Sequence, residues 1–353
     1  MTPTPESEGE PAIVYVDDYT HGWRRVRRGR GFSYLDEHGR VIRDKQTLAR
    51  LRKLAIPPAY TDVWICPDPA GHLQATGRDA KGRKQYRYHP LWKQWRSAAK
   101  FDRMLAFGRA LPALRRAVQR DLARRRLDLT TVAAAVVRVM DLQGLRVGNE
   151  VYTLENGSYG LTTLQRRHAK TRGTRLLLKF RGKSHVMRQC AIDDRRVVRI
   201  ARRCQDLPGQ RLFQFLDETG EACEIRSDHV NDYIRGICGK NFTAKDFRTW
   251  HGSVHAMALA LENANARDGD GAPSKLDAGE VAMQVARHLG NTPAVCRKFY
   301  IHPAVLALFG PTGRPLPRKR KSGKGLSQPE SALLALLASR KRAKRAKKRD
   351  RGK

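Results

Sequence analysis

Apolar and polar residues alternate along much of the first ninety positions. The clearest runs are 23–35 and 63–77, and turn-forming residues such as glycine and proline interrupt both. This alternation predicts β-hairpins, because successive side chains of a strand point to opposite faces of a sheet. We therefore expect a small β-rich domain over residues 13–90, preceded by a polar, disordered segment at 1–12.

From residue 91 onward, apolar residues recur at every third or fourth position, which is the spacing of one helix face. Further helices are predicted at 132–142, with Thr130 as N-cap, and at 197–204, 229–237, 249–263 and 276–289. A hairpin is predicted at 175–188, with its turn at 181–183. The chain is thus predicted to be α+β, with a mostly α-helical second domain over 91–310.

The composition changes after residue 311. Residues 314–353 hold 16 Lys or Arg and 2 Asp or Glu, with one short apolar run at 332–338. Such a basic segment is expected to be disordered when free and to add salt-sensitive affinity for DNA. We therefore predict a basic, disordered tail over 311–353.

Charge narrows the class of partner. The chain has 70 Lys or Arg against 34 Asp or Glu, a net charge of +36 and a pI near 10.8. A polyanion, above all nucleic acid, is the partner that this charge favours. Membrane-surface and ribosomal proteins share such a charge, but a hydrophobic content of 40% favours substantial packed cores.

The cysteines and the chain start bear on cofactors and compartment. Six cysteines are scattered without a Cys-x-x-Cys pair, which argues against a zinc site or a disulfide framework. The polar start does not resemble a signal peptide, and the apolar runs are too short to span a bilayer. We expect no metal or cofactor, no membrane association, and a cytoplasmic, nucleoid-associated location.

A candidate nucleophile stands in the segment 289–303. Gly290-Asn-Thr-Pro293 is expected to stop one helix near Leu289 and to start another, with Thr292 as its cap. The new helix carries Arg297 and Lys298 just before Tyr300. Cations beside a phenol favour its phenolate form and neutralise a nearby phosphate, so Tyr300 could attack a phosphodiester. The alternative is a tyrosine that only fills the core.

Three further segments carry candidate chemistry. In 78–90, Arg83 and Lys84 could hold phosphates, Gln85 could reach a base edge, and Tyr86 and Tyr88 could contact sugars or bases. Lys183 on a hairpin turn could deliver a proton. Lys245 and Arg248 at a helix start could bind an anion. The plainer alternatives are a solvated charged loop, an exposed turn lysine, and a surface ion pair with Asp246.

Taken together, six segments resemble type IB DNA topoisomerases of the compact bacterial and poxvirus kind, over about residues 20–305. They are Gly82-Arg-Lys-Gln-Tyr-x-Tyr88, Leu145-Arg-Val-Gly-Asn149, Gly157-Ser-Tyr-Gly-Leu-Thr-Thr163, Phe180-Arg-Gly-Lys183, Lys245-Asp-Phe-Arg-Thr-Trp250 and Gly290-Asn-Thr-Pro…Arg-Lys-x-Tyr300. The resemblance implies a β-rich N-terminal DNA-binding domain and a helical catalytic domain of the tyrosine recombinase/topoisomerase IB type, which form a clamp around DNA.

The resemblance also implies roles for individual residues. Tyr300 matches the nucleophile that forms a 3′-phosphotyrosyl link. Arg146 and Arg248 match the arginines that hold the phosphate, and Lys183 matches the acid that protonates the leaving 5′-oxygen. Lys245 matches a second lysine near the scissile phosphate. Gln85, Tyr86 and Tyr88 match N-terminal residues that touch DNA.

One position departs from the broader family. Nine residues before the nucleophile the family often has His, whereas this chain has Asn291. Asn can donate a neutral hydrogen bond to a phosphate oxygen, but it carries no charge. We keep Asn291 among the predicted catalytic residues.

The expected activity is relaxation of supercoiled double-stranded DNA by a monomer, through single-strand cleavage, strand rotation and religation, without ATP or metal. A tyrosine recombinase shares this chemistry, but it usually has His-x-x-Arg where this chain has Lys245-x-x-Arg248, and a helical N-terminal domain. A non-catalytic basic DNA-binding protein is the third alternative. It predicts that replacing Tyr300 by Phe leaves every DNA activity intact.

Overall fold

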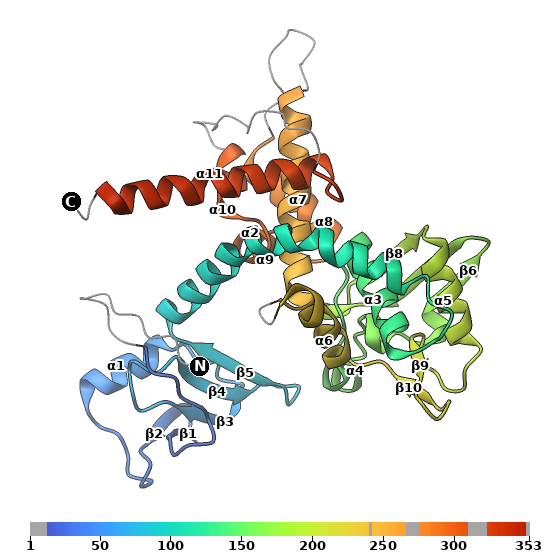
Figure 1. Cartoon of the computed structure of the whole chain (residues 1–353). Helices are drawn as coiled ribbons and strands as arrows, with labels where there is room; N and C mark the ends of the chain where they lie inside the picture. Colours follow the sequence, from blue (N-terminus) through green and yellow to red (C-terminus); the bar gives the residue numbers. More distant parts are fainter. Residues whose placement is uncertain (1–12, 240–241, 266–275, 310–322, 351–353) are drawn as a thin grey trace. The chain divides into compact units, whose positions relative to one another are not determined.

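The computed structural model describes residues 13–239, 242–265, 276–309 and 323–350 (Figure 1). The segment 1–12, predicted to be disordered, lies outside these ranges. The chain divides into two compact units, Met1–Lys100 and Phe101–Lys353. Helix α2, Pro90–Asp121, crosses this division. The predicted domain border at 90/91 therefore coincides with the start of α2 and lies ten residues before the change of unit.

The first unit is built on one antiparallel sheet with the strand order β2-β1-β3-β4-β5. Its strands are β1 (Trp23–Arg28), β2 (Gly31–Leu35), β3 (Thr61–Ile65), β4 (Leu73–Arg78) and β5 (Lys84–Tyr88). Helix α1, Lys45–Lys53, buries Leu51 against Val63, Ile65 and Ala75 of the sheet. The two predicted hairpins are present as β1–β2 and β3–β4, which confirms a β-rich N-terminal region.

The second unit is mostly helical. After α2 come α3 (Leu129–Gln143), α4 (Glu150–Asn156), α5 (Arg195–Gln205), α6 (Ser227–Cys238), α7 (Ala244–Asn265), α8 (Ala278–Leu289), α9 (Pro293–Phe299), α10 (Pro303–Leu306) and α11 (Gln328–Asp350). Helix α3 runs through the core, and nearly all of its residues from Thr131 to Asp141 are buried. Its N-cap is Asp128, whose carboxylate accepts from the Thr131 N–H at 3.0 Å, so the predicted cap Thr130 lies inside the helix.

A three-stranded sheet lies within the same unit, in the order β6-β7-β8 (Ala169–Arg172, Arg175–Arg181 and Met187–Ile192). The predicted hairpin is β7–β8, but strand pairing continues to Arg181, which faces Met187. The loop therefore runs from Gly182 to Val186, later than the predicted turn. A short two-stranded pair, β9 (Gln214–Leu216) and β10 (Ala222–Glu224), completes the strands of this unit that the structure describes.

The predicted disorder of 311–353 is wrong for residues 328–350, which form α11. Its first half packs on the rest of the second unit with Leu333, Leu336 and Leu337 buried, and Figure 1 shows it crossing α7. The physical reason is a helix start that the basic composition concealed. Ser327-Gln-Pro-Glu330 is a capping box with Pro in the first turn, directly before the apolar run. No described helix, α11 included, is long and apolar enough to cross a membrane.

Candidate active site

The predicted helix break at Gly290 is present and places two of the candidate residues. Gly290 adopts the left-handed conformation (φ 60°) at the end of α8, and the Asn291 N–H donates to the Ala286 carbonyl at 3.0 Å. Thr292 then caps α9, and Tyr300 follows as its C-cap residue, half-buried. Asn291 and Tyr300 are thereby fixed at opposite ends of one short helix.

Helix α7 holds the Tyr300 backbone from the other side. The Ser253 hydroxyl donates to the Tyr300 carbonyl at 3.1 Å and accepts from the His302 N–H at 2.9 Å. Gly252 lies so close that a Cβ atom there would stand 2.6 Å from the Tyr300 carbonyl oxygen. A glycine in mid-helix usually destabilises, so this close approach explains its presence.

Arg248 connects α7 to the tyrosine ring. Its side chain is 5% exposed, and its guanidinium carbon lies 5.1 Å from the centre of the Tyr300 ring. Its two terminal nitrogens donate to the carbonyls of Gly144 (2.7 Å) and Leu289 (3.0 Å), while Nε is buried without a hydrogen-bond partner. The predicted alternative, a surface ion pair of Lys245 and Arg248 with Asp246, is wrong for Arg248: Asp246 caps its own helix and pairs with Arg103 at 3.5 Å.

Arg146 completes the cluster. It donates to Asn291 Oδ1 at 2.8 Å and hydrogen-bonds Tyr300. Burial, and then the like charges of Arg248 and Arg188, lower the pKa of Arg146 to about 10, while Tyr300 opposes this shift. The Asn291 amide nitrogen is buried without a hydrogen bond of normal geometry, although its side chain reaches the Cys296 thiol. Buried donors around a phenol are suited to receive an anion.

Two of the motifs found in the sequence, 145–149 and 157–163, pair through backbone hydrogen bonds and so fix the backbone of Arg146. The Leu161 N–H donates to the Arg146 carbonyl at 2.9 Å, and the Thr162 N–H donates to the Val147 carbonyl at 2.6 Å. A Cβ atom on Gly160 would lie 2.5 Å from the backbone of Gly148, whose φ of 118° also requires glycine. The glycines of both motifs therefore let two backbones approach each other beneath Arg146.

Sequence reasoning missed Arg188 of β8. Its guanidinium donates to the His288 carbonyl at 2.9 Å, beside the Leu289 carbonyl that Arg248 holds. Burial and the charge of Arg248 lower the pKa of Arg188. The sequence signal for Arg188 was only a basic residue within a predicted hairpin strand, whereas Gly252 could have been noticed as a glycine inside a helical pattern.

The two lysines predicted to be catalytic, Lys183 and Lys245, are both exposed and lie near the cluster in sequence or through their hairpin. Lys183 is exposed in the β7–β8 loop, where Ser184 and His185 both have positive φ values of 62° and 59°. The same hairpin carries Arg188, so it reaches the end of α8 beside Asn291. Lys245 is exposed in the first turn of α7, one turn before Arg248. The contacts that define the cluster thus join four of the six predicted catalytic residues.

The five candidate DNA-binding residues lie at or next to β5, at an edge of the N-terminal sheet, but strand alternation divides them. Lys84, Tyr86 and Tyr88 share one face, where the two tyrosine rings stack 6.0 Å apart and Lys84 lies 5.8 Å from the Tyr86 ring. Gln85 and Arg83 instead both donate to the Asp79 carboxylate, at 3.0 and 2.8 Å. The side-chain hydrogen bond of Arg83, helped by the backbone N–H groups of Arg83 and Lys81 and by the charge of Arg83, lowers the pKa of Asp79 to about 2.

Comparisons with known families cover both units. The family described as "Eukaryotic DNA topoisomerase I, catalytic core" matches residues 90–308, which contain the whole cluster. The family described as "Bacterial DNA topoisomerase IB, N-terminal domain" matches residues 31–79.

Individual relatives agree with the family matches. The chain is 32% identical over 283 residues to "DNA topoisomerase 1B" of Acanthamoeba polyphaga mimivirus, covering 79% of this chain and 84% of the relative. It is 25% identical over 277 residues to the vaccinia virus (strain Copenhagen) protein of the same name, covering 76% and 83%. Among solved structures, the XerH site-specific recombinase bound to difH matches with a TM-score of 0.32, 11% identity and coverage of 64% and 56%, a similarity too low to decide anything. The chain belongs to the type IB DNA topoisomerases.

Proposed function

We propose that Tyr300 is the nucleophile with which this chain relaxes double-stranded DNA. Its phenol oxygen attacks a backbone phosphorus, the bond to the 5′-oxygen breaks, and a 3′-phosphotyrosyl link forms. The observation that carries the proposal is the convergence of Arg146 from the loop after α3, Arg248 from α7, and Asn291 and Tyr300 from the two ends of α9. Because the link conserves the energy of the broken bond, religation needs no ATP.

The two arginines are assigned to the phosphate oxygens. The transition state gathers negative charge on its equatorial oxygens, and guanidinium groups can meet these oxygens with two parallel hydrogen bonds. The buried, unpartnered Nε of Arg248 supports this assignment, because a buried donor without an acceptor is costly unless a ligand supplies one. Asn291 contributes a neutral amide hydrogen bond to the same phosphate.

The lysines are assigned to the leaving group and to the DNA strand. Lys183 would protonate the departing 5′-oxygen, a step that a positioned acid accelerates about 10²- to 10⁴-fold. Its place on a hairpin loop supports this role, since the side chain can enter the site with the DNA. Lys245, one turn before Arg248, would lie near the same phosphate.

On the first unit, Lys84, Tyr86 and Tyr88 would contact the duplex from one face of β5. Arg83 and Gln85 would approach from the other face or from its edge, held by Asp79. Closure of the two units around DNA as a clamp, action as a monomer, a preference for supercoiled DNA and a place on the nucleoid all stay part of this proposal.

The test is relaxation of supercoiled plasmid by the wild type and by Tyr300→Phe, in EDTA and without ATP. We expect relaxation by the wild type alone, together with a denaturant-resistant protein–DNA adduct. Equal relaxation by both proteins would remove Tyr300 as the nucleophile. A paired-site recombination assay on the same protein would separate the recombinase chemistry, which we expect to be absent.

A further inference from the structure

The C-terminal helix α11 begins in a buried polar network, in addition to its apolar contacts. The Glu330 carboxylate, on a residue that is 6% exposed, accepts from both terminal nitrogens of Arg115 at 2.7 and 2.9 Å. It also accepts from the Trp250 indole nitrogen at 3.0 Å and from the Ser327 N–H at 2.7 Å. Both carboxylate oxygens are therefore fully used.

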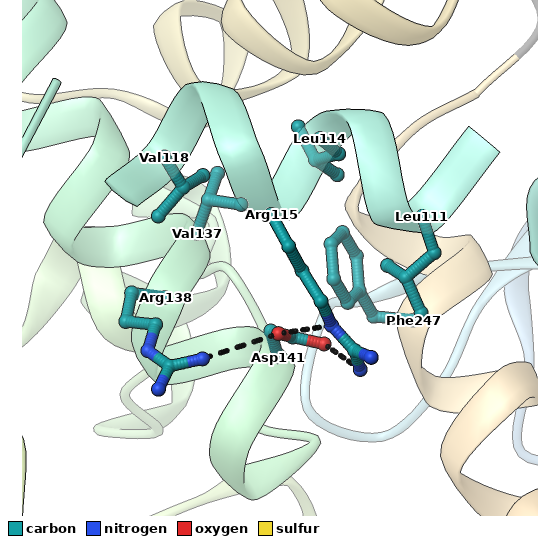
Figure 2. Close-up of a pocket in the computed structure, with 8 residues that line it drawn as sticks. All are labelled: Leu111, Leu114, Arg115, Val118, Val137, Arg138, Asp141 and Phe247. Carbon is teal, nitrogen blue, oxygen red and sulfur yellow. Dashed lines mark hydrogen bonds and ion pairs between the residues drawn. The ribbon is translucent and has the colours of Figure 1, made fainter. Parts of the chain in front are cut away.

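Arg115 of α2 extends this network to α3. It donates to both oxygens of Asp141, at 2.8 and 2.9 Å, and to the Gly325 carbonyl at 2.7 Å. Figure 2 shows Asp141 between Arg115 and a second arginine, Arg138, which lies 3.6 Å away. One guanidinium thus joins α2, α3 and the segment that leads into α11.

Both ends of this network lie next to catalytic arginines. Trp250 is two residues after Arg248 on α7. Asp141 is three residues before Gly144, whose carbonyl Arg248 holds, and five before Arg146. The ring of Trp250 packs directly on Gly108 of α2, since a Cβ atom at Gly108 would lie 2.3 Å from the ring. Leu334 of α11 packs at the same place, 2.7 Å from that Cβ position. A displacement of α11 would therefore move α7 and the end of α3, and with them Arg248 and Arg146.

Stability alone does not explain this arrangement. Replacing a buried ion pair by apolar residues of similar size is often neutral or stabilising, and α11 already buries three leucines. The retained charges instead fix one geometry, because bidentate pairs hold both distance and orientation.

We propose that Glu330 and Arg115 are positioning residues of strand cleavage: through Trp250 and Asp141, helix α11 holds α7 and α3 so that Arg248 and Arg146 meet the same phosphate. The proposal rests on the assignment of these two arginines to the phosphate. It reverses the expectation that residues 314–353 only add affinity for DNA, because the segment 327–337 becomes part of the catalytic framework.

The experiment is single-turnover cleavage of a DNA duplex at saturating enzyme and well below the melting temperature of the protein. The duplex is designed so that the cut strand dissociates, which prevents religation and leaves the cleavage rate alone to be measured. Glu330→Gln keeps the side-chain size but removes the charge and one acceptor. We expect its cleavage rate to fall by up to about 10²-fold, because a displacement of about 1 Å caused far from the reacting atoms can cost that much, with unchanged affinity for uncleaved DNA. Glu218→Gln, the same change in the exposed β9–β10 turn, is the matched control and should cleave normally.

A second variant guards against loss of folding. Trp250→Phe keeps an aromatic ring but removes the indole donor to Glu330 and the part of the ring that packs on Gly108, so its melting temperature is measured beside its cleavage rate. It should also slow cleavage, and combining it with Glu330→Gln should slow cleavage less than the product of the two single effects, because both act through one contact.

Two results would overturn the proposal. A folded Glu330→Gln protein with a lower melting temperature but a normal cleavage rate would limit α11 to stability. An equal loss of cleavage and of DNA affinity would place α11 in binding instead of positioning. Either result leaves the nucleophile assignment intact, since that assignment depends on Tyr300→Phe alone.

Discussion

Gly252→Ala tests most directly whether α7 sets the position of Tyr300, the proposed nucleophile. The added Cβ would stand 2.6 Å from the Tyr300 carbonyl oxygen and 3.0 Å from its carbonyl carbon and Cβ. Ordinary contact begins at 3.4 Å, so the two backbones must separate by 3.4 − 2.6 = 0.8 Å. Two of these three atoms are main chain and the third is the Cβ bonded to it, so none can rotate away as the end of a flexible side chain would.

The displacement should appear mainly in the chemical step. A misplacement of about 1 Å can cost about 10²-fold in rate, because attack needs the oxygen in line with the phosphorus. Overpacking should also destabilise the fold by about 1–3 kcal/mol. We therefore expect a loss of about two orders of magnitude in single-turnover cleavage, with DNA affinity close to that of the wild type.

Gly236→Ala in α6 is the matched control, because nothing lies within 4 Å of its added Cβ. It should be as stable as the wild type or more so, since alanine is favoured over glycine inside a helix by about 1 kcal/mol. Cleavage by Gly252→Ala at the wild-type rate would refute the reasoning, because the contact with Tyr300 could then relax without moving the phenol.

Three further predictions concern the acid, the histidines and the basic end of α11. Lys183→Ala should cleave slowly on normal DNA but regain its rate on a 5′-phosphorothiolate substrate, whose leaving group needs no proton; failure of this rescue would exclude Lys183 as the acid. Burial, then its histidine and arginine neighbours, lowers the His288 pKa to about 4 from 6.5. The unfolded state therefore binds more protons, and stability present above pH 6.5 should be lost as pH falls toward 4. His288→Gln should make this loss of melting temperature shallower, and an unchanged slope would contradict the assignment. Deleting residues 340–353, which hold 10 Lys or Arg against one Asp, should reduce the salt dependence of DNA binding while plasmid relaxation continues; an inactive protein would show that the basic end also acts in catalysis.

Local sequence signals predicted the elements that carry the chemistry. The helix stop and start at Gly290-Asn-Thr-Pro293, with Thr292 as cap, follows from the conformational preferences of those residues and is present. The β-rich first unit follows from period-two alternation. These features depend on neighbours in the chain, which a sequence displays directly.

The contacts across the catalytic unit could not be predicted in this way. Arg248 was expected at a helix start facing an anion, yet it is held by the carbonyls of Gly144 and Leu289, distant in sequence. The helix α11 was also missed. The high content of Lys and Arg in the last forty positions led to a prediction of disorder, although the capping box at Ser327 and Glu330 marks a helix start. That helix is stable because it packs on α7, and its partner is not visible in the segment itself.

The arginines around Tyr300 have a consequence for how this protein can evolve. Arg146, Arg188 and Arg248 repel one another, and the partners described for them are backbone carbonyls, an amide and the phenol, none of them a carboxylate. A carboxylate in place of Asn291 would pair with Arg146 and make the DNA-free protein more robust. The same ion pair would occupy the guanidinium that we assign to the phosphate. Selection for thermal stability and selection for strand cleavage therefore pull this position in opposite directions, and a neutral side chain is the compromise that keeps the site open to an anionic substrate.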